Sequence, residues 1–232
     1  MKSTLRALPL LLFVLSAPVF AKDGVQAGHY IEPGAVDFKT LAGDPPTDGS
    51  VQTKSEIEVM LQKQQLRTAE DEDRAQKEEH LSVFLFANVL GPWFEEKNLP
   101  LTTALFARAG GDLGGVTNTA KSYWHRPRPW LQDSRIHPAV TKPNNDSYPS
   151  GHAAAGEFYA LILAELAPDL KDRLLARGEQ IGDDRILAGV HFPSDVRAGR
   201  VIAREVVKRL LASPAFQSDL SQARAEFVKA RH

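Results

Sequence analysis

The sequence predicts an all-α fold in a single domain, and three observations support this prediction. Apolar residues recur at three- and four-residue intervals in most of the runs that could form regular structure. No convincing run alternates polar and apolar residues with the β-branched enrichment of a strand. The chain has 232 residues, of which 43% are hydrophobic and 25% charged, so one sizeable core is expected rather than two.

The first segment, residues 1–21, predicts a secretory signal peptide. Lys2 and Arg6 precede an apolar run of about 14 residues, and Val19 and Ala21 are small residues just before a cut after Ala21. An uncleaved anchor is less favoured because a membrane span needs about 20 apolar residues. The chain contains no cysteine, which suits a bacterial periplasm better than a small disulfide-bonded scaffold. We therefore expect a periplasmic protein with no membrane contact after cleavage.

The net charge excludes one class of partner. Cleavage removes Lys2 and Arg6 from the 28 basic residues and leaves 26 against 29 acidic ones, a net charge near −3. A protein with no basic excess is not expected to bind nucleic acid. The sequence does not decide between a monomer and a homo-oligomer.

A Gly- and Pro-rich lead-in, residues 22–50, has no sustained period and is expected to be ordered or partly ordered. It precedes one helical domain, residues 51–232. Two helices are expected within residues 52–90, where Gly91 and Pro92 end the helical pattern. Further helices are expected over 101–124, over 150–166, from Pro168 onward, and over 194–211.

The last two of these helices each have an apolar face. In the helix from Pro168, Arg185 continues an apolar stripe and is therefore expected to project near the end of a buried surface. The helix over 194–211 begins at a Ser-Asp cap. The two faces consist of Leu170, Leu174, Gly178 and Ile181 in the first helix, and of Val196, Gly199, Ile202, Val206 and Leu210 in the second.

The stretch "YPSGH" begins the helix over 150–166 with residues that suit a helix start. Pro149 has no N–H to lose there, Ser150 caps free N–H groups, and Gly151 lets a ligand approach the backbone. A helix N-terminus of this kind is an anion site. His152 is therefore placed to donate a proton to the bound anion.

Three polar clusters, "KSYWHRPRP", "YPSGH" and "DRILAGVHFPSD", fall at the ends of expected helices. Lys and Arg side chains suit a phosphate-like anion, Arg because its planar fork matches two oxygens. His191 lies four residues before Asp195, which would hold one ring nitrogen and leave the other as a nucleophile. These groups suffice for phosphoryl transfer without a metal, and no metal-ligand spacing such as His-Glu-x-x-His occurs.

The order and spacing of these residues resemble the three-part signature of the phosphatidic acid phosphatase type 2 superfamily. Within it, the chain is most similar to the bacterial class A non-specific acid phosphatases, with a looser likeness from about Leu41 to Leu211. The three parts are Lys121, six residues and Arg128-Pro129; then Pro149-Ser150-Gly151-His152; then Arg185, five residues, His191, three residues and Asp195.

The resemblance implies a role for each matching residue. His191 corresponds to a nucleophile that forms a phosphohistidine, Asp195 to the carboxylate that orients it, and His152 to the general acid. The phosphoryl oxygens would be bound by Lys121, Arg128, Ser150, Gly151 and Arg185. The resemblance also implies a helical bundle of the phosphatidic acid phosphatase type 2 and vanadium haloperoxidase type, with the site at one end and neither metal nor cofactor.

Two positions near the motifs need an interpretation of their own. Asp184 stands where the family usually has serine, and we expect it to pair with an arginine on the flank of its helix rather than face the phosphate. The remaining histidines are expected to be solvated or structural, and His125 is the best pocket candidate among them because it lies three residues before Arg128. These histidines are His29, His80, His125, His137 and His232.

The sequence thus predicts a secreted, metal-independent acid phosphatase that hydrolyses small phosphomonoesters with broad specificity. The alternatives are a vanadium-dependent haloperoxidase and a phosphate-binding protein without turnover. A bell-shaped pH profile is expected, because His191 must be neutral and His152 protonated. Asp195 is expected to raise the pKa of His191, and the cations to lower that of His152.

Overall fold

The computed structural model describes residues 28–32 and 34–231, and within them all regular secondary structure is helical. The all-α prediction is therefore confirmed, while the expected signal peptide lies outside the described residues. The α-helices are α1 (Phe38–Ala42), α2 (Val51–Leu66), α3 (Ala69–Lys77), α4 (Ala87–Leu90), α5 (Pro100–Trp124), α6 (Pro129–Gln132), α7 (Gly151–Leu166), α8 (Lys171–Leu187), α9 (Pro193–Ala212) and α10 (Pro214–Arg231). Short 3-10 turns occur at Val83–Phe86, Glu96–Asn98 and Pro168–Leu170.

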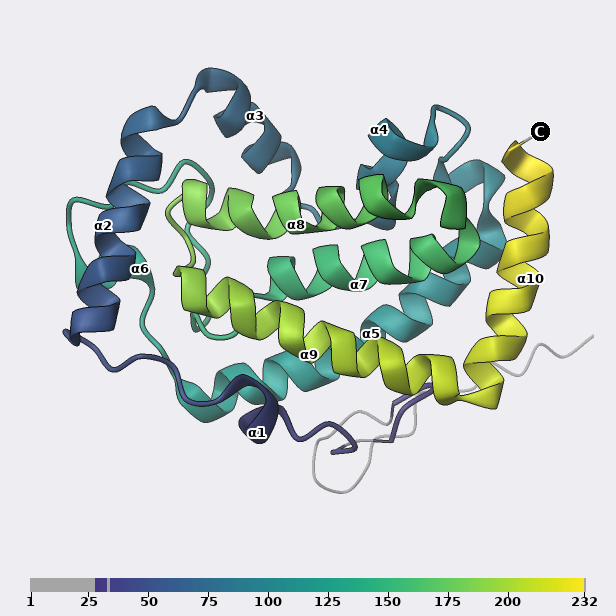
Figure 1. The fold of residues 1–232 in the computed structure, drawn as a ribbon, viewed down its shortest axis with the longest axis horizontal. Helices are drawn as coiled ribbons and strands as arrows, with labels where there is room; N and C mark the ends of the chain where they lie inside the picture. Colours follow the sequence, from purple (N-terminus) through teal and green to yellow (C-terminus); the bar gives the residue numbers. More distant parts are fainter. Residues whose placement is uncertain (1–27, 33, 232) are drawn as a thin grey trace, which may run out of the picture.

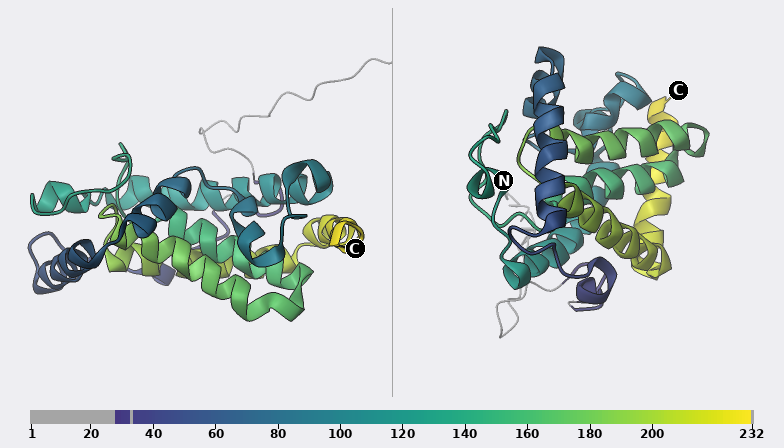
Figure 2. Two further views of the ribbon diagram at one scale, coloured as in Figure 1. Left: turned by 90° about the horizontal axis from the view of Figure 1, so that it is seen from above. Right: turned by 60° about the vertical axis from the view of Figure 1, so that its left-hand side comes forward.

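The architecture is a bundle built around α7. Helices α8 and α9 pack on either side of α7, and α5 packs against both α7 and α9 (Figure 1). Helix α10 crosses one end of the bundle, while α2 stands at the opposite end of the long axis (Figure 2). None of the described helices contains a stretch that is both long and apolar enough to cross a bilayer.

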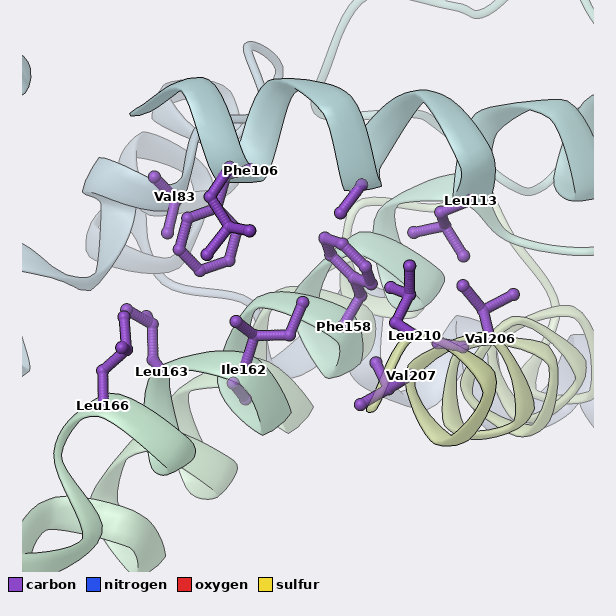
Figure 3. Close-up of a cluster of buried hydrophobic side chains, with 14 of the residues drawn as sticks. Val83, Phe106, Leu113, Phe158, Ile162, Leu163, Leu166, Val206, Val207 and Leu210 are labelled. Carbon is purple, nitrogen blue, oxygen red and sulfur yellow. The ribbon is translucent and has the colours of Figure 1, made fainter. Parts of the chain in front are cut away.

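The main core lies between α5, α7 and α9. Figure 3 shows Phe106 and Leu113 on α5 facing Phe158 and Ile162 on α7, with Val206 of α9 beside them. Because α7 is covered by helices on several sides, most of its residues are buried. This central helix is rigidly enclosed, which fixes the position of its N-terminal end.

The first helical stretch differs from the prediction of two helices within residues 52–90. The structure divides it into α2, α3, a 3-10 turn and α4. A capping box begins α3: the Asp71 N–H donates to Thr68 Oγ1 at 3.2 Å, and the Thr68 N–H donates to Asp71 Oδ2 at 3.1 Å. These bonds satisfy N–H groups at the start of α3 that have no partner within the helix. The chain therefore turns after Leu66 and begins α3 instead of continuing α2.

The lead-in is tied to the bundle within the described residues. Tyr30 donates from its hydroxyl to Asp219 at 2.6 Å and from its backbone N–H to Asp112 at 2.9 Å. The short helix α1 packs against α9 and α5. The helices over 101–124, 150–166 and 194–211 are confirmed to within two residues at each end, whereas α1, α6 and α10 were not predicted.

Helices α7 and α8 approach each other through two glycines. A Cβ atom added to Gly178 would lie 2.5 Å from the Gly156 carbonyl oxygen and 2.7 Å from Ala160 Cβ. Such distances are far shorter than van der Waals contact, so the close approach of the two helices requires glycine at this position.

We expect Gly178→Ala to lower the free energy of unfolding by about 1–3 kcal/mol, because the added methyl group overpacks the α7–α8 contact. Gly111→Ala is the matched control, since Gly111 is exposed on α5 and an added Cβ there has no neighbour within 4 Å. That change should stabilise the protein by up to about 1 kcal/mol through helix propensity. Urea unfolding of both variants measures the difference, and equal effects would contradict the close-packing argument.

Candidate active site

Four helix ends meet at the α2 end of the bundle. These are the N-termini of α7 and α9 and the C-termini of α5 and α8 (Figure 1). The Ser150 N–H donates to the Asp195 carbonyl at 2.9 Å and so joins the starts of α7 and α9. Between these ends lies a cavity of about 280 Å³. Six of the eight sequence-predicted site residues line it: Lys121, Arg128, Gly151, His152, Arg185 and His191.

The other two predicted residues lie directly behind the cavity wall. Ser150 and Asp195 are both fully buried. Ser150 caps α7, because its Oγ accepts the Ala153 N–H at 3.3 Å. Asp195 lies in the first turn of α9, where the helix dipole favours a negative charge. The structure therefore brings all eight residues together at one end of the bundle.

His191 lies between a carboxylate and a guanidinium. Its Nδ1 is 3.3 Å from Asp195 Oδ2, and its Nε2 is 3.0 Å from Arg128 Nη1. Because arginine can only donate, Nε2 is the acceptor and the ring proton is on Nδ1, directed at Asp195. This tautomer leaves the Nε2 lone pair, which a nucleophile needs, on the side of the cations.

The carboxylate of Asp195 receives three further hydrogen bonds. The donors are Arg126 Nη1 at 2.6 Å, the Ser147 hydroxyl at 2.6 Å and the Phe192 N–H at 2.8 Å. Burial raises the pKa of Asp195, but the bonds and charges of His191 and Arg126 outweigh it and lower that pKa to about 2. Asp195 is therefore a fixed negative charge behind His191.

The three cavity cations are held mainly by backbone carbonyls. Lys121 Nζ donates to the Asp146 carbonyl at 2.7 Å, and Arg128 donates to the carbonyls of Val190 and Asn145 at 2.7 and 2.8 Å. Burial is the main cause that lowers the pKa of Lys121 to about 7 and that of Arg128 to about 10. An anion that binds beside such a buried cation stabilises its charged form.

Arg185 is the cation with a carboxylate partner. Its Nη2 donates to Glu78 Oε2 at 3.0 Å and to the Ala75 carbonyl at 2.6 Å, both contributed by the C-terminal part of α3 and the residue after it. Glu78 also accepts from Arg177 Nη1 at 2.7 Å. The end of α3 thus positions Arg185 of α8 at the cavity.

His152 lies against the same segment. Its Nε2 is 3.1 Å from the Glu78 carbonyl, which can only accept, so Nε2 carries a proton. Burial first, and then the positive charge of Arg185, lower the pKa of His152 to about 4. The expected lowering of this pKa is confirmed, although burial contributes more than the cations.

Asp195 raises the pKa of His191 as expected, but burial outweighs this contribution. The pKa of His191 lies well below the usual value of 6.5, mainly because the ring is buried. The hydrogen bond to Asp195 does raise that pKa, but Arg128 and Lys121 act with burial against it. Burial therefore favours the neutral form of His191.

Asp184 does not face the cavity. Its carboxylate accepts two hydrogen bonds of 2.7 Å from Arg74 of α3, one from Nε and one from Nη2. This bidentate pair confirms the expected pairing with an arginine and compensates the negative charge of Asp184.

His125 does not line the cavity and is solvated, as expected for the remaining histidines. His125 is the C-cap of α5 with a left-handed φ of 50°, and its side chain is 70% exposed and bonded to Asp146. The left-handed cap turns the side chain away from the cavity, which spacing along the sequence alone does not reveal.

Arg126 and Glu56 are site residues that the sequence analysis did not assign. Both are buried, and Arg126 Nη2 lies 3.2 Å from Glu56 Oε2 while Nη1 bonds Asp195. Glu56 also accepts the N–H and the hydroxyl proton of Ser194 at 2.9 Å. The only sequence signal was the repeated Arg-Pro in "HRPRP", and nothing in the sequence linked Glu56 to it.

Comparisons with known proteins identify the family of this chain. Residues 100–215 match the family model described as the PAP2 superfamily. The chain is 32% identical to a non-specific acid phosphatase of Providencia stuartii over 84% of this chain and 82% of that protein. It is 33% identical to an acid phosphatase of Zymomonas mobilis subsp. mobilis (81% and 74% covered) and 36% identical to a non-specific acid phosphatase of Salmonella typhimurium (61% and 59% covered).

The fold, the site and the relatives define this chain as a phosphatase enzyme. It belongs to the PAP2 superfamily.

We expect Arg126→Met to lower the free energy of unfolding by about 3–5 kcal/mol, because it leaves the buried carboxylates of Glu56 and Asp195 without their shared cation. Arg135→Met is the control, since Arg135 also bridges two carboxylates, Asp133 and Glu58, but at the surface. That change should have little effect because the charges stay hydrated. Urea unfolding followed by circular dichroism compares them, and similar losses would show that burial of the Arg126 network is unimportant.

Proposed function

We propose that this chain is a secreted acid phosphatase that hydrolyses phosphomonoesters through a phosphohistidine on His191, without a metal and with broad specificity. The observation that carries the proposal is the setting of His191. Its Nδ1 is directed at a buried carboxylate and its Nε2 lies among cations at the cavity wall. Such a histidine is neutral, oriented and next to the groups that bind a phosphoryl anion.

The first step is an in-line displacement at phosphorus. His191 Nε2 forms the N–P bond while the ester P–O bond breaks, and Asp195 stabilises the positive charge that develops on the imidazole. Lys121, Arg128 and Arg185 bind the non-bridging oxygens, and the N-terminus of α7 adds the Gly151 N–H and the Ser150 hydroxyl. The cations stabilise the negative charge of the transition state.

His152 is proposed as the acid of the first step and the base of the second. Because the Glu78 carbonyl holds Nε2–H, Nδ1 is the atom that exchanges a proton with the leaving oxygen. The alcohol leaves with that proton. In the second step the ring accepts a proton from water, whose oxygen attacks the phosphohistidine and releases phosphate and neutral His191.

The absence of a metal is proposed from the chemistry of the groups present. Three cationic side chains can supply the charge stabilisation that other phosphatases obtain from metal ions. In the described part of the chain, no group of three or more His, Cys, Asp or Glu side chains could hold a metal ion. Secretion is proposed from the character of residues 1–21.

The pH profile of kcat/KM reports the free enzyme and that of kcat reports the substrate complex, and we expect the two profiles to differ. In the free enzyme the His152 pKa of about 4 means that kcat/KM for an alkyl phosphate falls as pH rises above about 4, because the general acid loses its proton. A bound phosphoryl anion favours the imidazolium, so the basic limb of kcat should lie at higher pH. Steady-state kinetics from pH 3 to 9 measure both profiles. If kcat and kcat/KM fell at the same pH, or if the rate rose up to pH 9, His152 would not be the general acid.

The roles of the two histidines should differ in their dependence on substrate. His191→Ala should abolish turnover and the acid-labile phosphoenzyme. His152→Ala should lose about two to four powers of ten on alkyl esters but much less on an aryl ester, whose leaving group departs without a proton. Rapid quench with ³²P-labelled esters in a strong chelator measures both variants.

The control for these two variants is His137→Ala, because His137 is exposed and makes its hydrogen bonds through the backbone. It should retain full activity. Burst-phase label on His191→Ala protein would show that another residue is the nucleophile. Loss of label in the chelator, restored by zinc or magnesium, would show that the reaction needs a metal.

A further inference from the structure

Glu79 is the one carboxylate among the described residues that line the cavity. The same lining contains three cations and two histidines. A carboxylate in this position repels the phosphoryl group, and the reaction steps above do not use it. If Glu79 interacts with the substrate, it therefore interacts with a part other than the phosphoryl group.

The side chain of Glu79 is held in place. Its Oε1 accepts the Thr141 N–H at 3.1 Å, and Thr141 itself lines the cavity. The carboxylate thus joins the segment after α3 to the loop between α6 and α7. The bonds from Thr141 lower the pKa of Glu79, which keeps the carboxylate ionised at mildly acidic pH.

The proposed reaction places the leaving alcohol near Glu79, because Glu79 adjoins the residue that holds the general acid His152. An in-line displacement puts the leaving oxygen opposite His191 and next to His152. His152 is held by the carbonyl of Glu78, the residue that directly precedes Glu79. The substituent on the leaving oxygen, and not the phosphoryl group, is therefore the part of the substrate that meets Glu79.

We propose that Glu79 determines leaving-group specificity. It favours phosphomonoesters whose alcohol carries a positive charge and disfavours those whose alcohol carries a carboxylate or a second phosphate. The inference rests on the proposed function, because it uses the direction of attack by His191. At the separations possible in a cavity of this size, one charge–charge interaction changes affinity by roughly tenfold.

Three alkyl phosphates of similar size test the proposal: 2-aminoethyl phosphate, ethyl phosphate and carboxymethyl phosphate. The measured quantity is kcat/KM for the cationic ester divided by kcat/KM for the anionic ester. Glu79→Gln keeps an oxygen for the Thr141 N–H but removes the charge, so this ratio should fall about tenfold or more. Glu70→Gln is the matched control, because Glu70 is exposed on α3, the helix that precedes Glu79, and lies outside the cavity, so it should leave the ratio unchanged.

A binding measurement separates this inference from the proposed mechanism. Calorimetry with 2-aminoethylphosphonate and phosphonoacetate, which cannot be hydrolysed, should give a ratio of dissociation constants that Glu79→Gln shifts by a similar factor. Differences in the protonation of the two probes cancel, since the same pair is compared on both proteins. If the esters are not turned over but the binding ratio shifts, the mechanism is wrong and the role of Glu79 stands. If Glu79→Gln leaves either the kcat/KM ratio or the ratio of dissociation constants unchanged, the inference is overturned. Glu79 then only connects the segment after α3 to the loop between α6 and α7.

Discussion

The buried carboxylate of Asp195 is the interaction on which the rest of this structure depends. A fully buried charge is costly unless every lone pair has a partner, and Asp195 meets this requirement with four donors from three parts of the chain. Arg126, Ser147, the Phe192 N–H and His191 all contribute hydrogen bonds. The requirement to satisfy one carboxylate therefore fixes the end of α5, the loop before α7 and the start of α9 relative to one another.

The helical bundle supplies the electrostatic setting for this carboxylate. Lys121 and Arg185 lie in the last turns of α5 and α8, where the helix dipole favours cations, and Asp195 lies in the first turn of α9. The N-terminus of α7 adds N–H groups at the same place. Because α7 is enclosed by its neighbours and approaches α8 through Gly156 and Gly178, these groups converge on a cavity that exists before a ligand arrives.

Helix α3 and the two residues that follow it organise the other side of the cavity. Arg74 neutralises Asp184, Glu78 positions Arg185, and the Glu78 carbonyl holds His152. The stretch "EDEDRAQKEE" resembles a solvated helix surface when it is taken by itself, since nearly every residue is polar or charged. In the structure several of these charges have buried partners more than 70 residues away, so the segment is part of the site.

Taken alone, the sequence determined the helical class of the fold, most of the long helices and the eight residues that the structure gathers at one end of the bundle. Helical periodicity and motif spacing are local properties, and they survive in any arrangement of the helices. Only the tertiary structure decided that Arg126 pairs with Glu56, that Glu79 faces the cavity and that His125 does not. It also decided the direction of the His191 pKa shift, because that shift depends on how completely the ring is removed from water. Burial and the partner of a charge depend on contacts between distant segments, and those contacts exist only once the helices have packed.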